Sequence, residues 1–145
     1  MNNEGSTMRE ASKKRYLRAA AHQNMSEIPF QENQVDISHI NTVLGTQYPL
    51  SMRSYEIAPP HQVEFALRLG NDMVYLTSLW ELGRDISFDA KGRKHYIDGK
   101  IKTRDSLEHF FEPDLGEFER LIDGVLQHIE GTGLGIIVGV QHVPK

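Results

Sequence analysis

The 145-residue chain has 39% apolar and 25% charged residues and a formal net charge of −4, which is the composition of an ordinary globular domain. The negative charge argues against nucleic acid or an anionic membrane surface as the main partner. The chain has no cysteine, which excludes disulfides, a thiolate nucleophile and any zinc site with Cys ligands inside this chain. No apolar run is long enough to span a bilayer and no apolar signal region stands at the N-terminus, so a cytoplasmic location is expected.

The chain is predicted to begin with a polar, frayed segment and a basic helix. Residues 1–6 are polar, and Thr7 with Glu10 forms a capping-box pattern for a helix that runs to about Ala21. Its basic side chains are expected on a solvated face, with phosphate binding as the less favoured alternative. These side chains are Arg9, Lys13, Lys14, Arg15 and Arg18.

A first strand and a second helix are expected next. The run around Pro29 predicts a strand over about 28–32, with Gln31 and Glu32 at its C-terminal end. Asp36 is placed to cap the following helix, which Gly45 would end.

The middle of the chain predicts the α-to-β half of an α/β unit. A helix over 61–69, with proline in its first turn, ends at Gly70, where the missing Cβ permits a left-handed cap. A short, continuously apolar strand over 72–77 follows at once, as in strands buried on both faces of a parallel sheet. Polar and aromatic groups stand where this strand ends, including Thr77 and Trp80.

The last third predicts a hairpin, a helix and a final strand. Residues 86–88 and 95–97 flank turn-forming residues and indicate a β-hairpin, an excursion over one end of the fold. Asp114 caps an amphipathic helix over 115–130. A third buried strand over 134–140 follows, and Gln141 and His142 stand just beyond it.

The chain resembles the N-terminal part of the uroporphyrinogen decarboxylase superfamily, which includes corrinoid-linked methyltransferases. Five segments carry the resemblance: Lys14–Ala20, Glu27–Phe30, Ala66–Asp72, Gly92–Gly99 and Pro113–Leu115. The resemblance implies an α/β fold, the N-terminal part of a (β/α)8 TIM barrel. Residues 1–145 would form a partial barrel domain with about three core parallel strands and the hairpin excursion.

Departures from the family pattern favour its methyltransferase branch. Family decarboxylases carry an Arg-rich loop after the first strand, whereas Phe30–Gln34 contains no Arg and Glu32 would repel an anionic porphyrinogen. They also carry an Asp after the second strand, at the place of Leu79 here. The resemblance then implies a corrinoid as substrate or partner cofactor, and zinc held by later strands. No metal site is expected within this chain.

Candidate site residues are those expected just beyond the C-terminal ends of the strands, where barrel active sites form. Catalytic roles are predicted for Glu32 and His142. Substrate-binding roles are predicted for Gln31, Thr77, Trp80 and Gln141. The alternatives are a loop histidine at 142, core packing for Trp80, and an ion pair of Glu32 with Arg53 or Arg84.

Three functions remain open at this point. The first is methyl transfer linked to a corrinoid, with a small molecule or a corrinoid protein as substrate. The second is decarboxylation of a tetrapyrrole. The third is a non-catalytic remnant or a subunit that needs a partner. We expect this chain alone to be inactive, and to self-associate or to require a complementing chain.

Overall fold

The computed structural model describes residues 9–23, 26–77, 83–109 and 114–139. Within these ranges no helix has the length and apolar character needed to cross a membrane.

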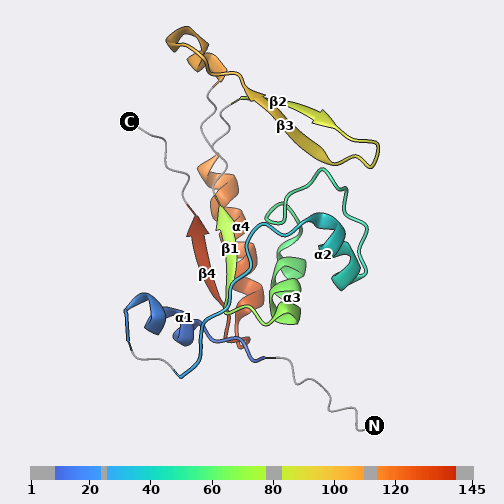
Figure 1. Ribbon diagram of the computed structural model, residues 1–145. Helices are drawn as coiled ribbons and strands as arrows, with labels where there is room; N and C mark the ends of the chain where they lie inside the picture. The colour runs from blue at the N-terminus through green and yellow to red at the C-terminus, as the bar shows by residue number, and fades with distance from the viewer. Residues whose placement is uncertain (1–8, 24–25, 78–82, 110–113, 140–145) are drawn as a thin grey trace.

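A pair of parallel strands lies at the centre of the fold (Figure 1). Strand β1 (Met73–Thr77) pairs with β4 (Gly135–Gly139) in a register that aligns the first residues of the two strands and also the last. Helix α4 (Leu115–Ile129) lies between them in sequence, which allows the chain to return and run in the same direction. The expected α/β class with parallel strands over 72–77 and 134–140 is therefore confirmed.

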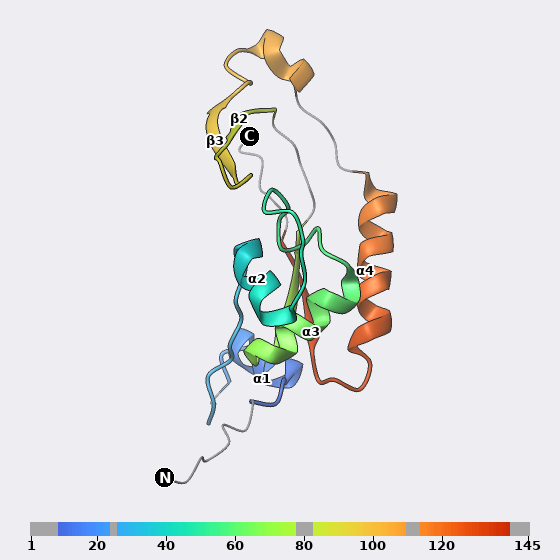
Figure 2. The ribbon, with the colours of Figure 1, turned by 90° about the vertical axis from the view of Figure 1, so that its right-hand side faces the viewer.

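Two helices cover one face of this strand pair. Val74 and Leu76 alternate along β1 and point to the same face. They pack there with Val63 of α3 (Pro59–Leu69) and Val125 of α4. The expected packing of both helices on one side is confirmed, and Figure 2 shows α3 and α4 beside each other.

The opposite face of the strand pair carries large side chains on β1 and glycines on β4. A Cβ on Gly135 would lie 2.7 Å from Met73 Sδ, and one on Gly139 would overlap the Tyr75 hydroxyl. Tyr75 and its register partner Ile137 are only half-buried. The second face is thus shaped for close packing but is incompletely covered by the residues that the structure describes.

Helix α2 (Ile37–Leu44) builds a second, smaller core against α3. Asp36 caps it by accepting a hydrogen bond from Ser38 N at 2.8 Å, and Gly45 ends it with φ 70°. Both terminal residues were predicted from sequence. The second core contains Ile37, Ile40, Ile57 and Phe65.

The first helix starts later than predicted. Helix α1 (Lys13–Ala20) is capped by Ser12, whose hydroxyl accepts from Arg15 N at 3.3 Å. Residues 9–12 are not helical, so the predicted start at Thr7, itself outside the described residues, is wrong. The reason is tertiary: Ser12 N donates to the Asp72 carboxylate at 2.9 Å.

The predicted strand over 28–32 does not form. The segment makes one backbone hydrogen bond to the start of β1, from Asp72 N to Phe30 O at 2.8 Å, instead of a strand ladder. Pro29 has no N–H to donate, and Gln34 has a left-handed φ of 55°, which interrupts the extended chain. The described residues therefore contain two core parallel strands, where three were expected.

The hairpin prediction is confirmed. Strands β2 (Arg84–Phe88) and β3 (Lys94–Gly99) pair antiparallel, with a left-handed Gly92 (φ 77°) in the turn. A short 3-10 helix, η1 (Arg104–His109), follows. In Figure 1 the hairpin lies beyond the end of β1 at which the strand arrow points.

Candidate functional site: a cationic cavity under the hairpin

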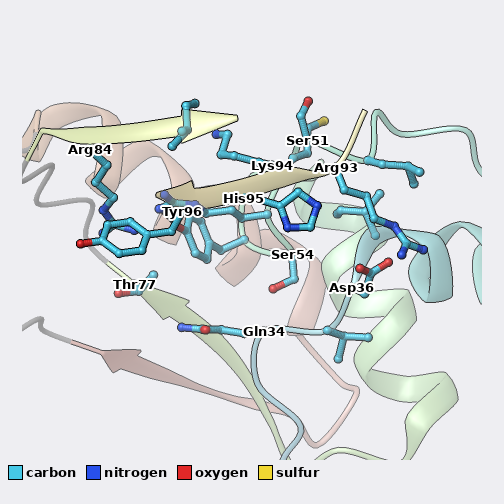
Figure 3. A pocket seen from close by; sticks show the side chains of 17 residues that line it. Gln34, Asp36, Ser51, Ser54, Thr77, Arg84, Arg93, Lys94, His95 and Tyr96 are labelled. Carbon is cyan, nitrogen blue, oxygen red and sulfur yellow. Dashed lines mark hydrogen bonds between the residues drawn. The ribbon is translucent and has the colours of Figure 1, made fainter. Parts of the chain in front are cut away.

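A cavity of about 550 Å³ opens between the hairpin and the C-terminal end of β1 (Figure 3). Its other walls are the segment 34–37 and the loop 50–55. This volume lies within the range of small-molecule sites, and the position is the edge of a parallel sheet at which such sites form. The cavity is therefore the candidate site.

The hairpin forms the roof of the cavity. Arg84 and Ile86 of β2 both line the cavity, on either side of a register shift between Asp85 and Ile86. Ile86 pairs with Tyr96 of β3, which also lines the cavity. Arg93, directly before β3, and Lys94, its first residue, bring two more positive charges.

Positive charge dominates the lining. Arg53, Arg84, Arg93 and Lys94 face a single carboxylate, Asp36, among the lining residues that the structure describes. In the described ranges no ion pair involves Arg84, Arg93 or Lys94. The lining therefore creates a positive local potential in a chain whose formal net charge is −4.

Arg53 and Arg93, both in the lining, differ in their hydrogen-bond partners. The Arg53 guanidinium donates to the Tyr55 hydroxyl and lies 5.7 Å from the centre of its ring. Arg93 Nε is a buried donor that has no hydrogen-bond partner among the described residues. An unmet buried donor of this kind is uncommon in folded proteins, because it costs the desolvation of the group without a compensating bond.

Asp36 and Tyr55 keep their ordinary charge states at neutral pH. Hydrogen bonds from the Ser38 hydroxyl (2.5 Å) and the Ser38 N–H (2.8 Å) hold the pKa of Asp36 below its usual value. Burial raises the pKa of Tyr55, against the opposing effect of Arg53. The lining thus presents one carboxylate and a neutral phenol to its cations.

Thr77 lies where the sequence placed it. It is the last residue of β1, is 3% exposed and lines the cavity, and its hydroxyl donates to Gly139 O at 3.0 Å. Its substrate-binding role stays a prediction.

Gln31 and Glu32 do not share the rim with Thr77. Glu32 N donates to Asn71 Oδ1 at 3.2 Å, which places this segment beside the N-terminal end of β1. Both residues line a smaller cavity of about 40 Å³. Their expected position at the C-terminal edge is therefore wrong, and Gln34, further along the same segment, lines the large cavity instead. Gln31 Oε1 is a buried acceptor without a hydrogen-bond partner among the described residues. The predicted chemical roles of Gln31 and Glu32 stay predictions.

Three other predicted site residues, Trp80, Gln141 and His142, lie outside the described residues. Their roles and positions remain predictions.

The sequence did not predict that Arg84, Arg93 and Lys94 contribute to the site. A usable signal was the number of basic residues within the predicted hairpin, in a chain that is acidic as a whole. In the part of the chain that the structure describes, Glu32 pairs with no arginine.

A second polar cluster lies at the other end of β1, around Asp72. The Asp72 carboxylate is fully buried and accepts hydrogen bonds from Ser12 N, Phe30 N and the side chains of Arg9 and Arg15. Burial raises its pKa, but the hydrogen bonds outweigh this and hold the pKa below its ordinary value. All these partners belong to the chain itself, so this cluster is a structural anchor.

The described residues bring no three His, Asp or Glu side chains together in a way that could hold a metal ion.

Comparisons with protein-family models, with curated proteins and with solved structures give no match to this chain.

Proposed function

We propose that the chain forms the N-terminal part of a barrel enzyme similar to the uroporphyrinogen decarboxylase superfamily. The complete barrel would pass a methyl group between a corrinoid and a thiol or a folate-type acceptor. The observation that supports a ligand site in this part is the position of the large cavity, at the C-terminal end of β1 and under the hairpin. Barrel enzymes place their active sites at this edge.

The second face of the strand pair supports the partial-barrel proposal. In a barrel, one face of every strand packs against helices and the other packs into the barrel interior. Val74 and Leu76 meet helices α3 and α4, whereas Tyr75 and Ile137 are half-buried on the other face. Further strands of the same barrel would cover these two side chains.

In this proposal the residues of this chain bind and orient the substrate. The corrinoid would supply the cobalt that carries the methyl group, and any zinc that activates a thiol would be held by later strands. Thr77 and the hairpin cations would surround the substrate from one side. The apolar lining at Ile86 and Tyr96 would shield part of it from water.

Decarboxylation of a tetrapyrrole is the second candidate, and one specific observation favours it. The segment after Phe30 has no arginine, but Arg53, Arg84 and Arg93 reach the cavity from other parts of the chain. Guanidinium groups bind carboxylates through charge-assisted hydrogen bonds. They would therefore replace, from other positions, the carboxylate-binding arginines expected in a decarboxylase.

One experiment separates these candidates. The purified chain is assayed alone and together with the polypeptide encoded directly downstream. Loss of the absorbance of methylcobalamin in the presence of a thiol measures methyl transfer, and mass spectrometry of a porphyrinogen substrate measures decarboxylation. We expect methyl transfer from the combined polypeptides and none from the chain alone. Decarboxylation without methyl transfer would favour the second candidate, and a combined preparation inactive in both assays would contradict both.

A further inference from the structure

We propose that the large cavity binds a small ligand through two or more carboxylate or phosphate groups, and that the β2–β3 hairpin supplies the groups that hold them. This inference deepens the proposed function, because it names the ligand class of the same cavity. It rests on that proposal for the assumption that the C-terminal end of β1 is the ligand site.

The positive charge of the lining is the first observation that supports an anionic ligand. Arg84, Arg93 and Lys94 come from one hairpin, line one cavity and form no ion pair within the described ranges. The other charged pairs of the hairpin show that partners were available nearby: Lys100 pairs with Asp85, and Lys102 with Asp98. Arg84, Arg93 and Lys94 thus line the cavity without a carboxylate partner within the described ranges.

The buried Arg93 Nε is the second observation that supports an anionic ligand. It has no hydrogen-bond acceptor among the described residues, although Asp36, the only carboxylate among the described lining residues, is close enough to be influenced by its charge. A carboxylate or phosphate oxygen would satisfy this donor with a charge-assisted bond. Figure 3 shows Arg84 and Arg93 extending from the hairpin toward the opposite wall of the cavity.

The positions of Arg84 and Arg93 support a ligand that has more than one anionic group. Arg84 is the first residue of β2, at the base of the hairpin, whereas Arg93 stands beside the turn. The ends of a strand of this length are roughly 13 Å apart, at about 3.3 Å per residue. Figure 3 shows the two side chains leaving the hairpin at opposite ends of the cavity, so a ligand with anionic groups at separate places can meet both guanidinium groups more readily than a monoanion can. We therefore expect polyanions to bind better than monoanions.

Calorimetric titration of the purified full chain tests this inference. The probes are pyrophosphate and citrate, with acetate as the monoanion and glycerol as the neutral control. We expect at least one polyanion to bind at least tenfold more tightly than acetate, glycerol not to bind, and affinity to fall as salt rises. Pyrophosphate alone would indicate a phosphate ligand, and citrate alone a polycarboxylate.

Substitutions identify the binding groups. Arg84→Gln and Arg93→Gln should each weaken polyanion binding about tenfold or more, because each removes a charge-assisted hydrogen bond. Lys91→Gln is the matched control, because it removes one positive charge from the same hairpin at a residue that does not line the cavity. It should change affinity less than threefold.

Asp36→Asn is expected to tighten polyanion binding, which a misfolded variant would not do. Asparagine caps helices about as well as aspartate, so α2 should remain folded. Loss of the one carboxylate among the described lining residues should tighten polyanion binding several-fold.

The inference is overturned if no polyanion binds, or if Lys91→Gln weakens binding as much as Arg93→Gln. Its failure is distinguishable from failure of the proposed function. A chain that binds polyanions while the combined polypeptides transfer no methyl group contradicts only the function. Methyl transfer without polyanion binding contradicts only the ligand class.

Discussion

The Arg15 guanidinium donates two hydrogen bonds to the Asp72 carboxylate, from Nη2 to Oδ1 at 3.0 Å and from Nε to Oδ2 at 3.2 Å. Asp72 is fully buried, and the Arg15 side chain is 11% exposed. The pair joins helix α1 to the start of β1 across 57 positions of sequence. Because the same carboxylate accepts from Ser12 N and Phe30 N, one side chain fixes three segments of the chain.

Asp72→Asn should therefore destabilise the fold strongly. The substitution removes the buried counter-charge of Arg15 and leaves the exposed Glu27 as its carboxylate partner among the described residues. Breaking a buried pair costs up to about 3–5 kcal/mol. Urea unfolding of the two proteins measures the difference. Glu64→Gln, which breaks the exposed pair between Glu64 and Arg68, is the control and should cost less than about 1 kcal/mol. Equal costs for the two substitutions would show that the Asp72 cluster is not an anchor.

Stability should fall at acidic pH, and Asp72 should account for part of the fall. Its pKa in the folded chain lies below its ordinary value, so its contribution is fully present above the unfolded pKa of about 3.9. The contribution is lost as pH falls through the folded pKa. The pKa values of Asp36 and Asp98 are lowered too and act in the same direction. Unfolding free energies between pH 6 and pH 3 should decline less steeply in Asp72→Asn, and an unchanged slope would contradict this.

Leu76→Ala should cost about 3 kcal/mol. Leu76 is fully buried between β1 and the covering helices, and truncation removes apolar contacts and leaves a cavity. Val138, its register partner on β4, is 43% exposed. Val138→Ala is therefore a control with the same strand environment, and it should cost less than about 1 kcal/mol. Denaturant midpoints of the two variants measure this difference, and equal or reversed costs would show that Leu76 is not more deeply buried than Val138 on their common face.

Gly124→Ala should destabilise although alanine favours helices. A Cβ at Gly124 would lie 2.9 Å from Pro59 Cγ, so α3 and α4 would have to separate. Overpacking of this kind costs about 1–3 kcal/mol, against a gain in helix propensity of about 1 kcal/mol. At Gly116, in the first turn of the same helix, the nearest atom to a new Cβ is 3.3 Å away. That atom is Oδ1 of the capping Asp114, the end of a side chain that needs to shift by only a few tenths of an ångström. Gly116→Ala should therefore cost less than Gly124→Ala in thermal unfolding, and equal losses at both sites would argue against a close α3–α4 contact.

The purified chain should self-associate, and it should catalyse neither methyl transfer nor decarboxylation by itself. Large apolar side chains are exposed on the hairpin and on the segment before Phe30: Ile28, Ile86, Phe88, Tyr96 and Ile97. Leaving about 300 Å² of apolar surface in water forgoes roughly 7 kcal/mol of burial energy. Sedimentation velocity over a range of concentrations tests the association. A stable monomer that turns over substrate would contradict the partial-barrel proposal.

Local chemistry in the sequence was sufficient to predict much of the fold. The caps at Asp36 and Asp114 and the left-handed stops at Gly45 and Gly70 act within one turn of a helix, so their sequence signatures are reliable. The apolar runs that form β1 and β4 likewise predicted a parallel pair. The expected burial is found in β1, whereas β4 is mostly half-buried and its Val138 is exposed. The turn residues around Gly92 predicted the hairpin for the same local reason.

Only the tertiary structure decided what the charged residues do. Arg9 and Arg15 were expected on a solvated helix face, but the buried carboxylate of Asp72 binds both. Pairing across about 60 positions depends on the whole chain path, and no local pattern encodes it. The same holds for the segment after Pro29: the left-handed Gln34 and the side-chain bonds to Asp72 stop it from forming a ladder. The candidate site depends on the chain path in the same way, since its cations become one lining only when the hairpin folds over the end of β1.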